Sequence, residues 1–259
     1  MALRALWKGI ITFGNMSVPV KLYAGLEDRT VHFRLLHRKD HQPVSQKMVS
    51  KETGREVSGQ SMRKGVATDR GIVMLDEQEL DELEPAASRK ISIEWFVPPG
   101  VLGPQWYDRP YYLGPDGNEA DYWNLYAAIG SKKVEGIGRW TMRGKEYIGV
   151  LRREMGCLVL ITLRFAEQII PPSRLNLPEF RNFEKEEMEM ARQLVGMMAG
   201  DFKAGDYRDE YRQQLLQLIE AKKKGKKVKI GKPAGRNEPE SLSGALQASL
   251  AAIRKKAHG

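Results

Sequence analysis

Residues 136–165 read GIGRWTMRGKEYIGVLRREMGCLVLITLRF, and the class of the fold follows from them. Their apolar side chains fall into three runs, at 136–143, 147–151 and 158–165. The short stretches between the runs each contain a glycine, which is typical of tight turns. Strands spaced this closely favour a barrel over a sheet of alternating strands and helices.

The same pattern, with a period of two, recurs nearer the N-terminus. Apolar side chains alternate along residues 18–23, 31–36 and 91–97, and each run predicts a strand. Residues 75–83 are acidic and predict a short helix, and Asn118 can cap a second helix that extends to about residue 129. We therefore expect a mixed β/α fold with a β-barrel core.

Residues 37–70 interrupt this pattern with a polar, basic stretch that contains little core-forming material. Met48-Val49 and Glu56-Val57 flank residues 52–55, which favours an extended hairpin. A hairpin too polar to pack is usually an exposed arm. We expect the barrel core to occupy residues 1–178 and to carry this arm.

The second half of the chain is helical in pattern. Asn182 can cap a helix with an acidic first turn, and its apolar stripe comprises Ala191, Leu194, Val195 and Met198. Asp206 can cap another helix, with Tyr207, Tyr211, Leu215 and Leu218 on one face. We expect this helical segment to span residues 179–221, followed by a tail at 222–259.

The excess positive charge belongs to that tail. The chain has a net charge of +9, and residues 221–259 alone carry eleven Lys and Arg against two acidic residues. Seven of the eleven are lysines in a stretch rich in glycine: Lys222, Lys223, Lys224, Lys226, Lys227, Lys229 and Lys232. Such a tail predicts a polyanionic partner, although a purely solubilising role is the alternative. Residues 241–256 predict a short amphipathic helix.

The sequence offers little that could carry out a reaction. Cys157 is the single cysteine, so an internal disulfide and paired-cysteine metal sites are excluded, and its place before an apolar run indicates a buried structural thiol. His32, His37 and His41 do not share one helical face, so we expect no metal site. No nucleotide-binding, zinc-protease or serine-hydrolase motif is present. We expect no catalytic residues, no metal and no cofactor.

The same reading bears on the compartment. No run of eighteen apolar residues is present, and the N-terminus lacks the pattern of a signal peptide. We expect a cytoplasmic protein that has no membrane contact.

The sequence resembles the bacterial Ku family of DNA end-binding proteins, which act in non-homologous end joining. The similarity covers residues 3–222 and is most specific in two motifs, the opening Trp7-Lys8-Gly9-x-Ile11-x-Phe13-Gly14 and the later Met142-Arg143-Gly144-Lys145-Glu146-Tyr147. Further matches are Val18–Tyr23, Val31-x-Phe33-x-x-Leu36-His37, Ile91-x-Ile93-x-x-Phe96-Val97, Pro110–Leu113, Gly136–Arg139 and Leu158–Ala166.

The resemblance implies a symmetric homodimer whose arms and barrels close a ring around the end of a double-stranded DNA. Such a ring holds the duplex through phosphate contacts, so no base needs to be read. The residues expected to meet the DNA are the cations of the arm and of the later hairpin: Arg38, Lys39, Lys47, Lys51, Arg55, Lys64, Lys132, Lys133, Arg143 and Lys145. Some family members carry cysteines in the arm, and this chain has none, so zinc or disulfide reinforcement is not expected there.

The segment after the core also resembles the family. In relatives it recruits a multi-domain ATP-dependent DNA ligase, so Tyr207, Tyr211, Leu215 and Leu218 are the expected contacts of that partner. The alternative is that this stripe packs on the protein's own core. Two other functions remain open: a basic nucleoid protein that coats DNA without end preference, and an end-processing nuclease with carboxylates that converge from separate strands.

Overall fold

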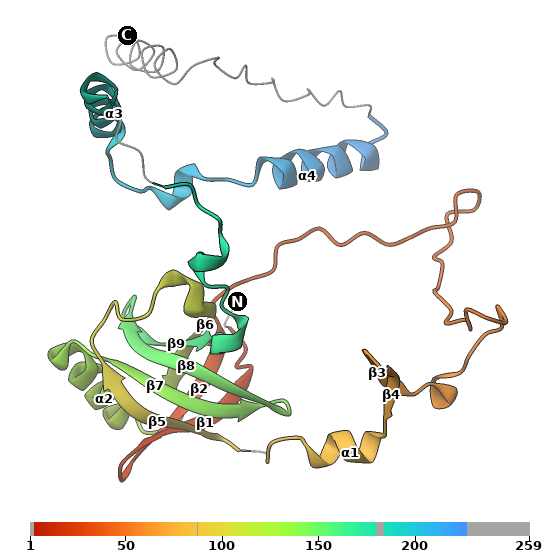
Figure 1. Cartoon of the computed structure of the whole chain (residues 1–259), viewed down its shortest axis with the longest axis horizontal. Coiled ribbons are helices and arrows are strands. Elements are labelled where there is room, and N and C mark those ends of the chain that lie inside the picture. Colours follow the sequence, from red (N-terminus) through yellow and green to blue (C-terminus); the bar gives the residue numbers. More distant parts are fainter. Residues whose placement is uncertain (1–2, 87, 180–183, 227–259) are drawn as a thin grey trace. The chain divides into compact units, whose positions relative to one another are not determined.

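A computed structural model describes residues 3–86, 88–179 and 184–226 of the chain. Seven strands form a closed barrel in the order β1-β2-β6-β9-β8-β7-β5 (Figure 1). The mixed fold with a β-barrel core is therefore confirmed. The barrel strands are β1 (Trp7–Phe13), β2 (Met16–Ala24), β5 (Lys90–Val97), β6 (Tyr107–Pro115), β7 (Glu135–Met142), β8 (Lys145–Glu154) and β9 (Cys157–Leu163).

All neighbouring barrel strands are antiparallel except β1 and β5, whose parallel pairing at Ile10–Thr12 closes the barrel. The hairpins β7–β8 and β8–β9 turn through two residues each, Arg143-Gly144 and Met155-Gly156. All four residues have positive φ, as a type I′ turn requires. This turn matches the right-handed twist of strands and holds their register.

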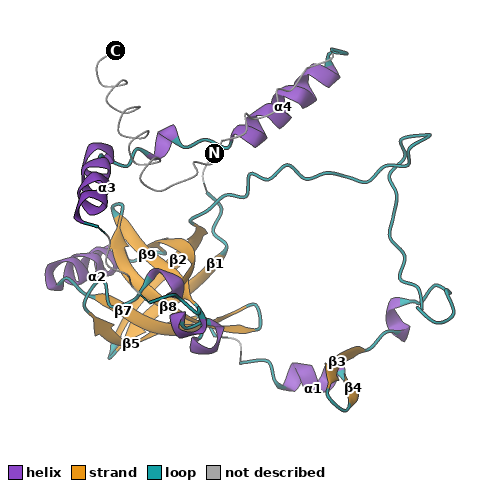
Figure 2. Cartoon of the chain, turned by 45° about the horizontal axis from the view of Figure 1, so that its top comes forward, coloured by secondary structure: helices purple, strands orange, loops and turns teal. Residues whose placement is uncertain are grey.

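The barrel core follows from the alternation along the strands. Most of its fully buried side chains are aliphatic, among them Ile11, Val18, Val20, Leu22, Ile91, Leu151 and Leu160. Helix α2 (Glu119–Lys132) lies against the barrel and contacts β2, β6 and β8 (Figure 2). The Asn118 side chain accepts a hydrogen bond from the backbone N–H of Asp121, which confirms the predicted cap.

Residues between β2 and β5 form a long excursion from the barrel, which we call the arm (residues 25–89). No described residue from Tyr23 to Lys90 is buried. The arm contains β3 (Lys64–Thr68), β4 (Gly71–Leu75), α1 (Glu77–Glu82) and isolated bridges that pair Leu36 with Pro43 and Val49 with Glu56. The exposed arm is confirmed, but its strand ladder lies at 64–75 rather than around residues 52–55, where a single bridge closes a turn.

The strand predicted at 31–36 is wrong. No strand is formed there, and Phe33 and Leu35 are 71% and 67% exposed. Alternation is necessary for a half-buried strand, but a strand also needs a neighbour to pair with along its length. Among the described residues this segment has one bridge, between Leu36 and Pro43.

The chain divides into two units, Met1–Arg174 and Leu175–Gly259. The second contains α3 (Lys185–Met198) and α4 (Glu210–Lys223). The remaining short elements are 3-10 turns, at Gly59–Ser61, Pro104–Trp106, Ala166–Gln168, Pro172–Arg174 and Ala204–Asp206. No helix among the described residues has both the length and the apolar character that crossing a membrane demands.

Two predicted helix boundaries in the second unit need correction. Asp209, not Asp206, caps α4, since its carboxylate accepts a hydrogen bond from the N–H of Arg212 at 2.8 Å. Helix α4 continues to Lys223, so the first lysines of the tail are helical, where cations suit the negative end of the helix dipole. For α3 the preceding residue is Glu184, while Asn182 lies outside the described residues.

Candidate nucleic-acid interface

The basic part of the arm spans residues 29–70, which contain ten Lys and Arg and four acidic residues. Its predicted cations are all exposed: Arg38 and Lys39 lie in a turn, Lys51 and Arg55 in the next turn, and Lys64 begins β3. Within the described part of the chain, no ion pair is formed by any of these five side chains. They are therefore available to an anion.

Lys47 differs from the other predicted cations of the arm. Its Nζ lies 2.7 Å from Oε2 of Glu56, so a carboxylate of the arm already compensates its charge. Both side chains are mostly exposed, and an exposed pair of this kind is weak enough for a phosphate to replace the carboxylate.

Two cations in the basic part of the arm that form no ion pair with a described residue escaped the sequence prediction. Arg34 and Arg70 are exposed, and neither forms an ion pair within the described residues. Arg34 lies in the segment at 31–36, which the alternating pattern predicts to be a strand. Arg70 lies in the turn between β3 and β4. The sequence around it is polar and does not distinguish a turn between strands from a loop.

Six acidic residues of the arm lie together outside its basic part. Residues 76–84 contain six Asp and Glu and no Lys or Arg. They include α1, where Asp76 and Glu79 form a capping box, and Asp76 also pairs with Arg63. The first 220 residues have no net charge, so a surface for phosphate requires this separation.

The β7–β8 turn carries the second group of predicted cations, Arg143 and Lys145. Arg143 lines a cavity of about 420 Å³ together with Trp7, Ser88, Arg89, Thr141, Met142 and Gly144. Arg89 is a further basic residue that the sequence prediction missed. Its only sequence signal is its place beside Lys90 at the start of β5. Glu84 adjoins the same turn, because a Cβ on Gly144 would lie 2.7 Å from its Oε2.

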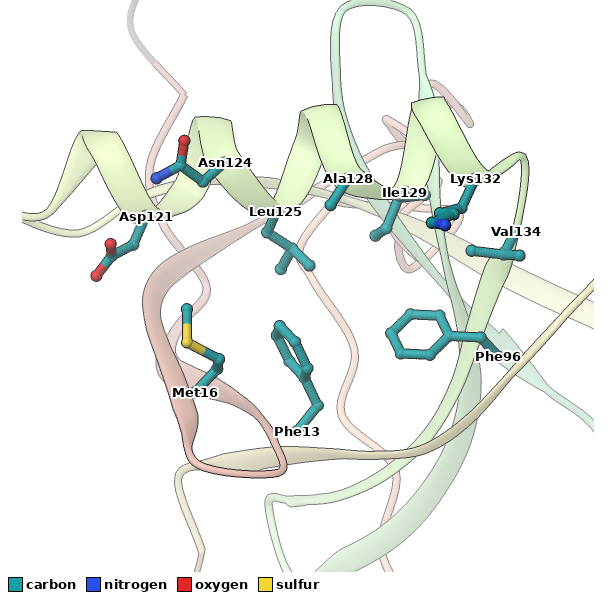
Figure 3. Close-up of a pocket in the computed structure, with 10 residues that line it drawn as sticks. All are labelled: Phe13, Met16, Phe96, Asp121, Asn124, Leu125, Ala128, Ile129, Lys132 and Val134. Atoms are coloured by element: carbon teal, nitrogen blue, oxygen red, sulfur yellow. The ribbon is translucent and has the colours of Figure 1, made fainter.

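Lys132 and Lys133 form a third group, at the C-terminal end of α2, and their surroundings differ. Lys132 lines an apolar groove of about 510 Å³, in which Phe13 and Phe96 face Leu125 and Ile129 of α2 (Figure 3). Lys133 lines a separate cavity beside β8. Lys132 and Lys133 precede β7, and Arg143 follows this strand. The second and third groups of cations are therefore separated by the length of β7, roughly 25 Å at ~3.3 Å per residue.

Lys133 and Arg143 share an uncommon backbone conformation. Their φ angles are 50° and 54°, in the left-handed region, which costs a residue with a Cβ about 1–2 kcal/mol. Glycine or asparagine would occupy both positions at lower cost. The fold alone therefore favours another residue type at both positions.

Lys8 and Lys21 show the contrasting case of compensated cations. Their Nζ atoms lie 3.1 and 3.0 Å from the carboxylate of Asp116. Hydrogen bonds from Lys21 and then Lys8 hold the pKa of Asp116 below its ordinary value. This cluster ties β1 and β2 to the end of β6 and leaves less charge for an external phosphate.

The predicted contacts of a partner protein lie in the second unit. Tyr211, Leu215 and Leu218 share one face of α4, with spacings of four and three residues. Tyr207 lies outside the helix, which corrects its predicted place, and its ring stacks on Phe202 with centroids 5.2 Å apart. No described residue of this unit is buried, so the packing of this stripe on a core is not seen in residues 175–179 and 184–226.

The tail is described only as far as Lys226. Lys222, Lys223, Lys224 and Lys226 are exposed, and Lys223 pairs with Glu220 at 3.0 Å. Lys227, Lys229, Lys232 and the helix predicted at 241–256 lie outside the described residues.

Groups that could support chemistry are sparse. Among the described residues, no three His, Cys, Asp or Glu side chains gather in a way that could hold a metal ion. Cys157 is half-buried, and burial followed by the charge of Glu154 raises the pKa of its thiol. A raised pKa disfavours the thiolate, the nucleophilic form of cysteine.

Comparison with known proteins gives consistent matches. A family model described as the Ku70/Ku80 beta-barrel domain matches residues 12–191. The non-homologous end joining protein Ku of Archaeoglobus fulgidus is 35% identical, over 97% of this chain and 100% of its own length. Non-homologous end joining protein Ku 2 of Geotalea uraniireducens is 33% identical, over 99% of this chain and 100% of its own length. The non-homologous end joining protein Ku of Coxiella burnetii is 35% identical, over 90% of this chain and 87% of its own length.

Proposed function

This chain belongs to the Ku β-barrel family, and on that basis we propose that it binds the ends of double-stranded DNA in non-homologous end joining. It does so without regard to sequence, as a ring-shaped homodimer, and it recruits an ATP-dependent DNA ligase. We assign no reaction to the chain itself. A protein with this role acts at the nucleoid.

The observation that carries the proposal is the arm, with its uncompensated cations on an exposed segment. Arg38, Lys39, Lys51, Arg55 and Lys64 are exposed and form no ion pair among the described residues. Lysine and arginine that meet phosphates release counterions from the duplex, which supplies sequence-independent affinity. Phosphate contacts alone suffice where encirclement, rather than base reading, retains the DNA.

Apolar side chains on the same arm support the homodimer. Phe33, Leu35, Leu36, Val44, Met48 and Val49 are all more than half exposed. In β4, Ile72 and Met74 are 75% and 69% exposed, and a two-stranded sheet without a packed face is marginal in water. A second copy of the chain would cover these side chains through a symmetric contact.

Recruitment of the ligase rests on α4. Tyr211 is largely exposed, and it forms one face with Leu215 and Leu218. An aromatic residue beside aliphatic ones on a helix is a typical anchor of a protein interface. Phe202 and Tyr207 precede the helix in the sequence, and their rings stack on each other. They add aromatic surface to the segment before the helix.

Topological trapping tests the ring. The full-length protein is bound to a linear duplex, the duplex is ligated into a circle, and the complex is challenged with high salt. We expect retention on the circle and release when a restriction enzyme reopens it. As a control, protein added after circularisation should not be retained.

The rival functions give different results in the same assay. A protein that coats DNA would dissociate from the circle and from the linear fragment at the same rate. It would also bind covalently closed DNA as tightly as linear DNA. A nuclease would shorten an end-labelled duplex when magnesium is added. Release at equal rates from circular and linear DNA would refute encirclement.

A further inference from the structure

A cavity of about 440 Å³ lies between the C-terminal end of α2 and strand β8. Three cations line it, Lys133, Arg152 and Arg153, together with two acidic residues, Glu135 and Glu154. The remaining lining residues are Pro99, Ile129, Gly130 and Val134. The volume is in the range typical of small-molecule sites, roughly 300–1,000 Å³.

Arg152 forms a fixed part of the wall. Its Nη2 lies 3.1 Å from Oε1 of Glu135 and donates a hydrogen bond to the Tyr107 hydroxyl at 2.6 Å. Its guanidinium carbon also lies 4.9 Å from the centre of the Tyr107 ring. Glu135 is 6% exposed, so these two charges largely compensate each other. Arg152 therefore shapes the cavity and adds little free charge to it.

Arg153 is held differently and keeps its charge. Its guanidinium carbon lies 4.6 Å from the centre of the Tyr126 ring, on helix α2. It forms no ion pair within the described residues, and the same holds for Lys133. The ring orients the guanidinium without neutralising it. Two cations without an ion pair among the described residues thus line one cavity, and the carboxylate of Glu154 lines it as well.

Gly130 explains how the guanidinium fits. Glycine in the interior of a helix is destabilising relative to alanine, and Gly130 lies in the last turn of α2. A Cβ at this position would lie 2.1 Å from Nη1 of Arg153. The glycine therefore leaves the space that the arginine side chain occupies.

We propose that this cavity binds a phosphate group through Arg153 and Lys133. The fork of a guanidinium and the point charge of an ammonium are the two side-chain groups that bind phosphate most effectively. Lys133 holds its place with a left-handed φ of 50°, where glycine would cost less, which is consistent with a role for its charge. The phosphate belongs either to a free polyphosphate or to the DNA backbone.

Tripolyphosphate tests the site without DNA, so the proposal does not depend on end binding. Isothermal titration calorimetry on the full-length protein should show saturable binding. Arg153→Gln and Lys133→Gln should each weaken it at least about tenfold, the typical effect of losing a hydrogen bond to a charged group. Equal affinity of the wild type and Arg153→Gln would overturn the proposal.

Arg139→Gln is the matched control for charge. Arg139 lies on β7, pairs with Glu94 at 3.1 Å and Glu146 at 3.6 Å, and does not line the cavity. The variant has the same net charge as Arg153→Gln and should bind tripolyphosphate like the wild type. An equal loss in both variants would show a general charge effect and contradict a site.

Gly130→Ala separates the space from the charge. The variant keeps every cation and gains helix propensity, so its melting temperature should not fall. The new Cβ displaces the Arg153 guanidinium, so tripolyphosphate should bind several-fold more weakly. Wild-type affinity in this variant would contradict the assigned arrangement of Gly130 and Arg153.

The source of the phosphate follows from a second measurement, the salt dependence of binding to a short linear duplex. Arg153→Gln can lose affinity for tripolyphosphate and also reduce the log–log salt slope of duplex binding by about one. In that case the phosphate group that the cavity binds belongs to DNA. If only tripolyphosphate binding is lost, a free anion is the ligand. Failure of the wild type to bind any duplex would refute the proposed function and leave this site standing.

Discussion

Arg143 illustrates, at the scale of one residue, how backbone and side chain can have opposing preferences. It occupies the first central position of a type I′ turn with a φ of 54°, followed by Gly144. Asparagine followed by glycine is the pair that such turns prefer. The arginine therefore costs stability that its interaction with an anion would offset.

The variant Arg143→Asn should separate these two effects. Because asparagine suits the turn, the free energy of unfolding should rise by up to about 1 kcal/mol. DNA affinity should fall, and the log–log salt slope should become shallower by about 0.9 if one phosphate contact is lost. Denaturant unfolding and fluorescence anisotropy measure the two quantities. Unchanged affinity and slope would remove Arg143 from the interface.

Tyr122 shows, in the core, what a single buried polar group contributes to stability. Its buried hydroxyl donates to the carbonyl of Leu113 at 2.6 Å and accepts from the N–H of Leu158 at 2.9 Å. Burial raises the pKa of the phenol, the hydrogen bond from Leu158 opposes this shift, and the group stays protonated.

We expect Tyr122→Phe to destabilise the barrel by about 1–3 kcal/mol, because it leaves buried polar groups without a partner. The midpoint of urea unfolding should fall, while DNA binding per folded molecule should not change. A midpoint equal to that of the wild type would show that the buried groups find another partner.

At the scale of an element, the arm contributes exposed surface without a core of its own. Its isolated bridges and the β3–β4 hairpin supply hydrogen bonds but bury no side chain. Removing apolar side chains from it should therefore leave the barrel intact and affect only association between copies.

The double variant Phe33→Ser, Leu35→Ser tests this expectation. Burial of each side chain contributes roughly 1.5–3 kcal/mol, so the dimer dissociation constant should rise at least about 100-fold. Sedimentation velocity measures the dissociation, and thermal unfolding of the barrel should not change. Val101→Ser, in the loop after β5 and also exposed, is the control on the barrel side. A dimer as tight as the wild type would exclude this segment from the contact.

Helix α4 is the second element with an unpartnered face. Tyr211→Ala combined with Leu215→Ala should abolish stimulation of the ligase and leave DNA binding intact, because the helix carries its interface residues on one side. Gln213→Ala combined with Gln217→Ala changes the opposite face and should have no effect. Comparable ligase stimulation by both double variants would refute the assigned face.

At the scale of the whole molecule, the charge is divided between a neutral body and a basic tail. If the tail neutralises six or seven phosphates, its removal should make the log–log salt slope shallower by roughly 5 to 6. The prediction concerns a chain that lacks residues 222–259. Anisotropy titrations across salt concentrations measure the slope, and sedimentation should show the dimer unchanged.

A second truncation after Gly225 controls for damage to α4, which ends at Lys223. It keeps Lys222, Lys223 and Lys224, so its slope should lie between those of the wild type and the shorter chain. An unchanged slope in both truncations would show that the tail does not contact DNA.

Local patterns in the sequence were sufficient for five of the seven barrel strands, but they did not predict β1 or β6. The alternation at 18–23, 91–97 and 136–165 predicted strands of the barrel, and Asn118 predicted the start of α2, because periodicity and caps act over a few residues. The same patterns overpredicted a strand at 31–36, since pairing requires a distant neighbour that the sequence of the segment does not encode.

Only the tertiary structure placed the side chains relative to one another. The parallel pairing of β1 with β5 joins residues about eighty positions apart, and it brings Arg89 near Trp7 and the β7–β8 turn. Similarly, the packing of α2 beside β8 puts Arg153 against Gly130 and Tyr126. Composition and spacing describe neighbours along the chain, whereas a binding site depends on distances between strands and helices, which are decided by how the barrel closes.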